Sequence, residues 1–346
     1  MKNVALYIHI PFCKQKCLYC DFPSFAGIED CMLDYAAAIA KEINSIRDKK
    51  IKTIFIGGGT PTYLSLAGWE MIGKSIDRLD MCDDLEFTVE GNPGTFTREI
   101  LNFLKKIGVN RISIGLQAFQ DSLLKQLGRI HTIEDFKQSF QMARNLGFDN
   151  INVDLMFGLP SQTLKQWIET LENVTNLNPE HLSCYSLIVE EGTAFYKRLE
   201  EGTLNLPDEE LERTMYAQTI EYLGEKGYIQ YEISNFAKNN KSCRHNLVYW
   251  EMGEYIGCGA SSHSYSDGFR YRNEENIEKY IKKINVDCCA IVEKTKNSFK
   301  DDMEEFMFMG LRKNVGISKS EFRGRFGKDI DTVYREVINK DRKSVV

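Results

Sequence analysis

Six short runs of apolar residues, most of them followed by a stretch with helical spacing, constrain the fold of this chain more than any other feature. The runs cover residues 4–10, 53–56, 85–90, 111–115, 151–155 and 181–184. Their apolar residues are continuous rather than alternating, which is typical of parallel strands covered by helices. The repeated β/α unit predicts a full or partial barrel, and periodicity leaves a doubly wound open sheet as the alternative.

The rhythm changes after about residue 185. A helical segment over residues 208–226 precedes a stretch rich in glycine, asparagine and aromatic residues over 227–272, and further helical segments close the chain. The length of 346 residues is enough for one large domain and an appendage. We therefore expect an α/β barrel-like domain over residues 1–190 and a smaller α+β domain over residues 191–346.

The charge balance and the hydropathy of the sequence indicate where in the cell the protein is expected and which partners are not. The net charge is −6, with acidic and basic residues interspersed, which indicates neither nucleic acid nor an anionic membrane as a partner. The N-terminal residues are a poor signal peptide, and no apolar run approaches the roughly 20 residues that span a bilayer. We expect a cytoplasmic protein.

Three of the ten cysteines fall close together directly after the first predicted strand. Cys13, Cys17 and Cys20 form a C-x3-C-x2-C motif, while the other seven are dispersed. Thiolates hold iron–sulfur clusters or zinc, and a closed zinc site needs a fourth ligand that this loop lacks. Three thiolates on a cubane cluster leave one iron open to a small molecule. The motif therefore favours a [4Fe–4S] cluster, with a zinc site or a redox pair as alternatives.

Glycine and polar residues gather where later strands end. The segment Gly57–Gly59 ends the second strand and would let backbone amides approach a ligand, although a tight turn would use the same residues. Glu90, Gln117, Arg129 and Asp154 lie at or near the following strands. Buried polar groups are costly unless paired, so they predict either a ligand site or structural ion pairs, Arg129 with Asp154 being the obvious pair.

A second set of residues has the chemistry of a heme site. His245 follows Cys243 and Arg244, and Tyr249 and Trp250 come close behind. An imidazole can ligate the iron, an arginine can pair with a propionate, and aromatic rings can pack against the macrocycle. Cys243 is a second candidate ligand. The structural alternative is a loop histidine that hydrogen-bonds the backbone.

The cysteine motif, with an aromatic Tyr19 before its last cysteine, resembles the signature of the radical S-adenosylmethionine (SAM) superfamily. That resemblance implies a partial (β/α) barrel in which the open iron of a [4Fe–4S] cluster binds SAM. Electron transfer from the cluster then cleaves SAM and generates a 5′-deoxyadenosyl radical. The segment Gly57–Thr62 is similar to the form found in the anaerobic coproporphyrinogen oxidase and its relatives.

Within those relatives, the chain is most similar to the heme chaperone family, HemW. The oxidases carry a fourth cysteine two positions after the third and a longer segment before the cluster, whereas this chain has Phe22 there and twelve residues before Cys13. The sequences of residues 90–95, 154–163, 244–250 and 304–312 also match the chaperone family. We therefore expect no decarboxylation of coproporphyrinogen. The chain also stops earlier than such relatives, so the last domain is expected to be incomplete at its end.

The resemblance assigns residues and partners as follows. Matching positions serve the cluster-bound SAM: Tyr7, Cys13, Cys17, Cys20, Gly58 and Glu90. Matching positions surround a second SAM: Gly59, Thr60, Gln117, Arg129 and Asp154. The H-N-x-x-Y-W pattern assigns heme to His245. Heme would be the cargo, apo-hemoproteins its recipients, and an electron donor a further partner, with membrane contact only where a recipient is membrane-bound. An oxygen-independent coproporphyrinogen III oxidase, another radical SAM enzyme such as a methyltransferase, and a zinc-binding structural protein are the alternatives.

Overall fold

A computed structural model describes residues 2–344, with side chains through residue 340. Within that range, twelve strands form one sheet in the order β12-β11-β10-β9-β1-β2-β3-β4-β5-β6-β8-β7. The strands are β1 Lys2–Ile10, β2 Lys49–Gly58, β3 Asp80–Gly91, β4 Arg111–Gln117, β5 Ile151–Phe157, β6 His181–Ser186, β7 Ile229–Glu232, β8 Asn235–Ala237, β9 Tyr255–Cys258, β10 His263–Ser266, β11 Phe269–Asn273 and β12 Ile291–Lys296.

Helices connect the strands and follow the expected rhythm in the first half of the chain. They are α1 Met32–Ile43, α2 Leu66–Ile76, α3 Arg98–Lys106, α4 Asp121–Gln126, α5 Ile133–Asn145, α6 Leu164–Asn176, α7 Ala194–Glu200, α8 Glu209–Glu225, α9 Arg244–Trp250, α10 Ile277–Asp287, α11 Phe299–Gly310, α12 Lys319–Phe326, α13 Ile330–Val333 and α14 Arg335–Ser344. Short 3-10 turns occupy Glu29–Cys31 and Pro61–Tyr63.

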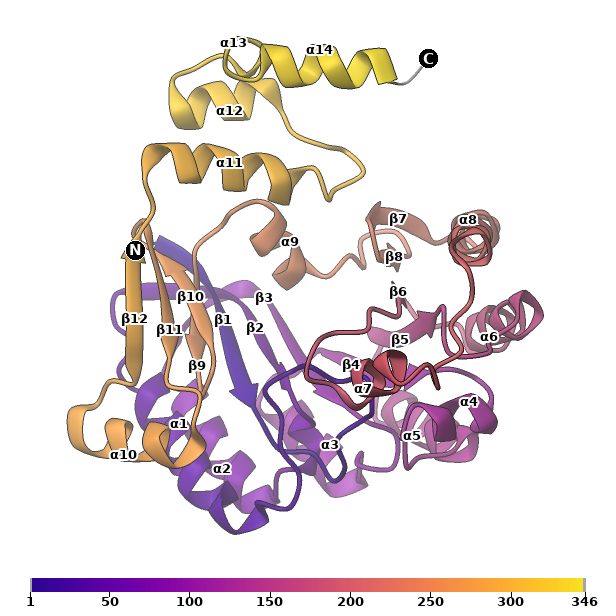
Figure 1. Cartoon of the computed structure of the whole chain (residues 1–346). Coiled ribbons are helices and arrows are strands. Elements are labelled where there is room, and N and C mark those ends of the chain that lie inside the picture. The colour runs from indigo at the N-terminus through magenta and orange to yellow at the C-terminus, as the bar shows by residue number, and fades with distance from the viewer. Residues whose placement is uncertain (1, 345–346) are drawn as a thin grey trace.

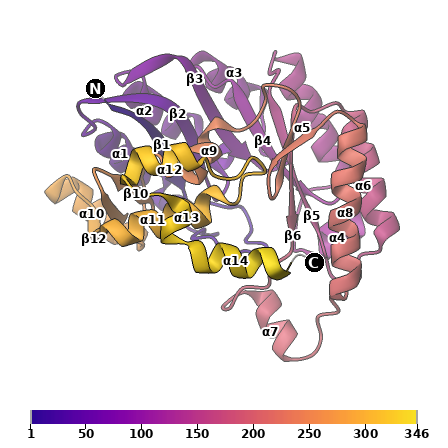
Figure 2. The same ribbon diagram turned by 90° about the horizontal axis from the view of Figure 1, so that it is seen from above.

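The first six strands are parallel and lie side by side in sequence order. A doubly wound sheet reverses its strand order at a switch point, so this order excludes that alternative. Figures 1 and 2 show the strands curving, with α1 to α6 along their outer side. The sheet ends at β12 and β7 without closing, which confirms the predicted partial barrel.

Side-chain alternation in β1 separates the core from the barrel interior. Leu6 and Ile8 are fully buried and belong to the apolar cluster that includes Tyr35 of α1. Successive strand residues point to opposite faces, so Tyr7 and His9 point to the inner face. The outer face of the sheet therefore supplies the hydrophobic core, and the inner face carries the polar residues.

Residues beyond 190 extend the same sheet at both edges. Strand β9 pairs in parallel with β1, and β10 to β12 continue that edge in antiparallel fashion. At the other edge, β8 pairs with β6 and β7 with β8, both antiparallel. The domain boundary at 190 stays a prediction, because the sheet runs across it without a break.

The C-terminal helices α11 to α13 share a small apolar core with Met252 and with Tyr265 of β10. The helices contribute Met303, Phe306, Phe322, Phe326 and Ile330, all of them buried. Figure 1 shows these helices stacked above the barrel strands, at the end of the molecule where β1 begins.

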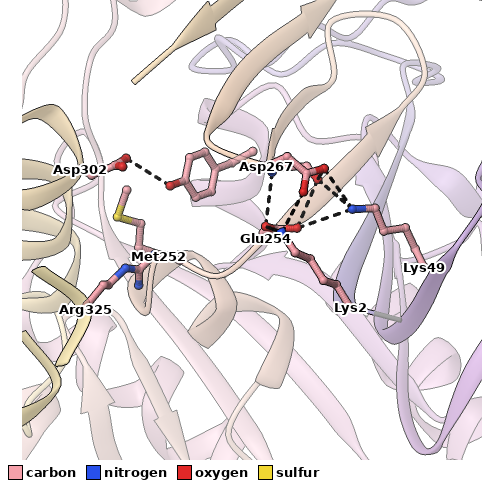
Figure 3. Close-up of polar contacts among 9 residues, drawn as sticks. Lys2, Lys49, Met252, Glu254, Asp267, Asp302 and Arg325 are labelled. Atoms are coloured by element: carbon pink, nitrogen blue, oxygen red, sulfur yellow. Dashed lines mark hydrogen bonds and ion pairs between the residues drawn. The ribbon is translucent and has the colours of Figure 1, made fainter. Parts of the chain in front are cut away.

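Polar contacts join this helical layer to the extended sheet (Figure 3). Arg325 of α12 donates to the carbonyl oxygen of Met252 at 2.9 Å, and the Tyr265 hydroxyl of β10 donates to Asp302 of α11 at 3.2 Å. Lys2 donates to Glu254 at 2.9 Å and to Asp267 at 2.8 Å, which links the start of β1 to the β9–β10 edge. Each of these hydrogen bonds joins segments that are far apart in the sequence.

Among the described residues, none of the helices combines the length and the apolar character needed to cross a lipid bilayer.

Candidate functional site

The cysteine loop leaves β1 and is held on both sides by backbone hydrogen bonds at Leu18. The Leu18 amide donates to the Leu127 carbonyl at 3.0 Å, and the Phe195 amide donates to the Leu18 carbonyl at 2.9 Å. Tyr19 packs against the Phe195 ring, with centroids 6.4 Å apart. Leu18 and Tyr19 thus anchor the loop in a small apolar cluster between α4 and α7.

Each of the three thiols has its own hydrogen-bonding neighbour. Thr60 Oγ1 donates to Cys13 Sγ at 3.4 Å, and Arg129 Nη1 donates to Cys17 Sγ at 3.4 Å. The Cys20 thiol lies 3.7 Å from the Ser24 hydroxyl. Donors aimed at sulfur stabilise thiolates and tune iron–sulfur clusters.

Burial raises the pKa of the Cys13 and Cys20 thiols above the usual range, so iron would have to displace their protons on binding. Among the described residues, no three His, Cys, Asp or Glu side chains are grouped as a single metal ion requires. Three softly ligating sulfurs with donors beside them fit a cluster better than a closed zinc site.

The glycine segment at the end of β2 is packed by the protein itself. A Cβ atom on Gly57 would lie 2.5 Å from Glu90 Oε2, and one on Gly58 would lie 2.3 Å from the His9 ring. Gly58 also has a φ of +108°, which side chains rarely adopt. These glycines therefore let Glu90 and His9 approach the strand end, and the Gly58 amide donates to Glu90 Oε2 at 3.3 Å.

A hydrogen-bonded chain connects the inner face of β1 to the cysteine loop. The Tyr7 hydroxyl lies 2.9 Å from His9 Nδ1, and His9 Nε2 lies 2.9 Å from the Pro23 carbonyl oxygen. Because a carbonyl can only accept, Nε2 carries the proton and Nδ1 accepts from Tyr7. Tyr7, a predicted SAM residue, is thus positioned by the same histidine that fixes the loop after Cys20.

Two buried carboxyl groups, Glu90 and Asp154, lie inside the barrel. Burial, followed by the charge of Asp154, raises the pKa of Glu90 to about 8. Burial also raises the pKa of Asp154, although it accepts hydrogen bonds from Ser113 at 3.0 Å and Asn152 at 2.8 Å. A cationic ligand placed between them would favour their ionised forms, so the pair is suited to a ligand with an amino or sulfonium charge.

Arg129 lies next to the cysteine loop and does not form the ion pair with Asp154 that the sequence suggested. Its Nη2 donates to Asn92 Oδ1 at 2.9 Å and also to the Gly115 carbonyl oxygen, while Nη1 donates to Cys17. The break between α4 and α5 makes this placement possible, because it turns the chain back toward the loop at Gly128.

Gln117 ends β4 with an unusual backbone. Its φ is +75°, and the β4–β5 register shifts between Gly115 and Gln117. Strain of this kind in a non-glycine residue costs on the order of 1–3 kcal/mol and is concentrated at functional sites.

His245 occupies a different environment from the one expected of a heme ligand. Its ring is 1% exposed, Nδ1 lies 2.9 Å from Thr53 Oγ1, and Nε2 lies 2.9 Å from the Tyr249 hydroxyl. Burial lowers its pKa to about 3. Both ring nitrogens are engaged, so His245 offers the iron no free lone pair in this structure.

The neighbouring residues of the expected heme motif also have protein partners. Cys243 is fully buried, with burial raising its thiol pKa to about 12, and Arg244 pairs with Asp84 at 3.0 Å. The Arg312 guanidinium lies 4.4 Å from the Trp250 ring centroid. Only Tyr249 of this set lines a large cavity.

Sequence reasoning missed His9 and Asn92. His9 lies between Tyr7 and the cysteine loop, and Asn92 Nδ2 donates to Thr60 Oγ1 at 2.8 Å while Oδ1 accepts from Arg129. Two sequence signals could have identified them. Side-chain alternation along β1 places His9 on the inner face with Tyr7, and Asn92 belongs to the polar turn that follows Glu90. A small cavity beside Cys17 is lined by Thr60, Asn92, Arg129 and His131 among others.

Comparison with known proteins agrees with this geometry. Residues 7–174 match the Radical SAM superfamily, and residues 298–340 match the HemN C-terminal domain. A solved structure of coproporphyrinogen III oxidase (HemN) from Escherichia coli superposes with a TM-score of 0.86 at 22% identity, covering 97% of this chain and 82% of that one. The partial barrel with a cysteine loop after β1 is therefore that of a radical SAM protein.

Relatives at higher identity define the family within that class. The heme chaperone HemW of Bacillus subtilis is 42% identical over 340 residues, which cover 96% of this chain and 90% of that protein. The heme chaperone HemW of Escherichia coli is 40% identical over 266 residues, covering 75% of this chain and 69% of that protein. The chain belongs to the HemW heme chaperone family.

Proposed function

We propose that this protein binds heme and delivers it to apo-hemoproteins, and that it carries a [4Fe–4S] cluster and SAM. The observation that carries the proposal is the 42% identity to a heme chaperone over 96% of the chain. Membership of the radical SAM superfamily implies the cluster and SAM. Heme is the cargo rather than a resident cofactor.

Cys13, Cys17 and Cys20 would hold the cluster, which supplies an open iron for SAM and an electron for its reduction when bound. Residues already assigned by resemblance would bind SAM. Tyr7, Gly58 and Glu90 would serve the cluster-bound molecule. Gly59, Thr60, Gln117, Arg129 and Asp154 would surround the second.

The structure suggests what these side chains contribute. Glu90 offers a carboxylate oxygen at the amide of Gly58, where a SAM amino group would find an acceptor. Thr60 donates to the Cys13 sulfur and Arg129 to the Cys17 sulfur, so their first effect would be on these thiolates. The charge of bound SAM would thus affect the cluster through Thr60 and Arg129, which would contact both the ligand and the cysteines.

The proposal also implies the partners of the protein and its location in the cell. The recipients would be apo-hemoproteins, and an electron donor would be needed if SAM is reduced. We propose a cytoplasmic location, with membrane contact only through a membrane-bound recipient and no role for nucleic acid.

An oxygen-independent coproporphyrinogen III oxidase is the second candidate, because its solved structure has the same fold. The residue two positions after Cys20 weighs against it. Phe22 stands there with a 61% exposed side chain, where the oxidases carry a fourth cysteine. An apolar ring cannot replace a thiol as an acid, a ligand or a redox group.

Parallel assays on the anaerobically reconstituted protein test this proposal. With SAM and a strong reductant present, we expect hemin to bind with a Soret band and coproporphyrinogen III to remain undecarboxylated. A known coproporphyrinogen oxidase in the same assay controls for the reductant. Porphyrinogen turnover at the rate of that control, without heme binding, would move the protein to the oxidase class.

A further inference from the structure

A wide cavity opens between the barrel and the C-terminal strands. It has a volume of about 430 Å³, within the range of small-molecule sites. Its lining comes from distant parts of the chain: Tyr7, His9, Phe22, Pro23, Tyr249, Tyr255, Ser261, His263, Arg272 and Glu275. Strands β1, β9, β10 and β11, which supply much of this wall, lie side by side in Figure 1.

Histidine availability decides which residue can ligate iron here. His9, His181 and His245 each have both ring nitrogens within 3 Å of a hydrogen-bonding partner. The Nε2 atom of His131 has no hydrogen-bond partner, but this residue is only 7% exposed and lines the small cavity beside the cysteine loop, not the wide one. Among the described side chains, His263 is the histidine with an exposed ring and no hydrogen bond to it.

The residues around His263 match the other groups of heme. Arg272 is its direct cross-strand partner, so both side chains lie on the same face of the β10–β11 pair. Arg272 now pairs with Glu275 at 3.6 Å and Glu293 at 3.4 Å, but both carboxylates are largely exposed. Surface ion pairs of this kind contribute little, so a propionate can replace them.

Aromatic side chains form the apolar part of the wall. Tyr249 and Tyr255 pack edge to face, with ring centroids 4.7 Å apart. The exposed Phe22 ring reaches the same cavity from the loop after Cys20. Flat rings of this kind suit a porphyrin face.

We propose that this cavity is the heme site, with His263 as the axial ligand of the iron and Arg272 as the partner of a propionate. The proposal rests on the heme-binding function proposed above and assigns that function to a site. His245 then has a positioning role, because its Nε2 holds the Tyr249 hydroxyl at 2.9 Å and so fixes a wall of the cavity.

Hemin titration of the full-length reconstituted protein, followed by Soret absorbance, tests the site. His263→Gly should shift the Soret band and weaken binding by roughly tenfold or more, since an iron–ligand bond is lost. Added imidazole should restore the band, which a misfolded variant could not do. His263→Cys should bind hemin with the spectrum of a thiolate complex, which places the residue at the iron.

Charge variants test the propionate contact separately. Arg272→Gln should weaken hemin binding about ten- to a hundredfold while leaving the Soret position unchanged. Lys294→Gln is the matched control, because Lys294 pairs with Tyr271 on the opposite face of the same strands. We expect that variant to bind as the wild type does.

The outcomes separate the site from the function. Wild-type protein that binds no hemin would overturn the proposed function and this site with it. Unchanged affinity and spectrum in His263→Gly and His263→Cys, with normal wild-type binding, would overturn the site alone. A loss of SAM affinity without any effect on hemin would assign the cavity to SAM instead.

Discussion

Inside the barrel, ionisable side chains occupy buried positions where an ordinary hydrophobic core would have apolar side chains. Glu90 and Asp154 have raised pKa values, and Arg129 donates to a cluster cysteine. Such groups are costly to keep without a ligand, because each loses hydration. A charged ligand bound inside the barrel would offset this cost, which explains why the groups are arranged in this way.

Glu90→Gln should change how stability depends on pH. The folded pKa of Glu90 is raised from 4.5 to about 8, so the folded state favours the protonated carboxyl. Its stabilising contribution is complete below pH 4.5 and is lost as pH rises to about 8. Relative to Glu90→Gln, the wild type should lose on the order of a few kcal/mol of unfolding free energy across that window.

Urea unfolding of the cluster-free protein without SAM would measure this difference. Glu201→Gln, at an exposed position after α7, is the control and should follow the wild type. Parallel curves for the wild type and Glu90→Gln would show that Glu90 keeps an ordinary pKa.

Cluster assembly should depend on the triplet and on no distal cysteine. Reconstituted anaerobically, the wild type should hold about four irons per chain. Serine at position 13, 17 or 20 should abolish the cluster, because a hydroxyl is a poor ligand for iron–sulfur clusters, whereas Cys289→Ser should leave it intact. Iron and sulfide analysis provides the measurement. Full iron content in a triplet variant together with loss in Cys289→Ser would place the cluster elsewhere.

At the scale of elements, continuous apolar runs predicted the six parallel strands because burial by helices leaves a strong signal. Strands β7 to β12 gave no such signal, since they span only three to six residues each and form by pairing with an existing edge. Between β4 and β5 the chain forms two helices, α4 and α5, rather than one. Gly128 lies at the break between the two helices, and the spacing of apolar residues alone does not reveal that break.

The site was predictable in part for a related reason. Cysteine spacing and polar residues at strand ends are local in sequence, so Cys13, Glu90 and Asp154 could be singled out. The partners of Arg129 and His245 depend on which strands become neighbours. The sequence suggested an Arg129–Asp154 pair, and for His245 either a heme ligand or a loop histidine bonded to the backbone. In the structure Arg129 donates to Cys17, and the His245 ring lies between the hydroxyls of Thr53 and Tyr249.

Gly58→Ala tests whether the end of β2 is built by close packing. The added methyl group would meet the His9 ring, and the φ of +108° would be strained. We expect a loss of about 2–4 kcal/mol of unfolding free energy, from overpacking and backbone strain together. Chemical denaturation measures it.

Gly108→Ala is the matched control for that experiment. Gly108 has a φ of +93° but nothing within 4 Å of its Cβ position, so it reports backbone strain without the clash. It should lose only about 1 kcal/mol. Equal losses in the two variants would mean that His9 moves aside without cost.

At the scale of the whole molecule, the single sheet brings the cysteine loop and the C-terminal strands to one cavity. Strand β1 lies between β2 and β9, so one strand connects the predicted SAM residues on one side with the proposed heme cavity on the other. Tyr7 and His9 belong to both. An effect of SAM or of the cluster on cargo release would have a short route through these two side chains.

The central claim is that the protein binds heme in order to give it away. The most direct measurement loads the reconstituted protein with hemin, mixes it with a heme-free globin, and follows the acceptor's spectrum after the two proteins are separated. The account predicts that heme appears in the acceptor while the donor loses it, at a rate that exceeds release into buffer alone. Heme that stays on the donor, or that reaches the acceptor no faster than it is released into buffer, would contradict the account.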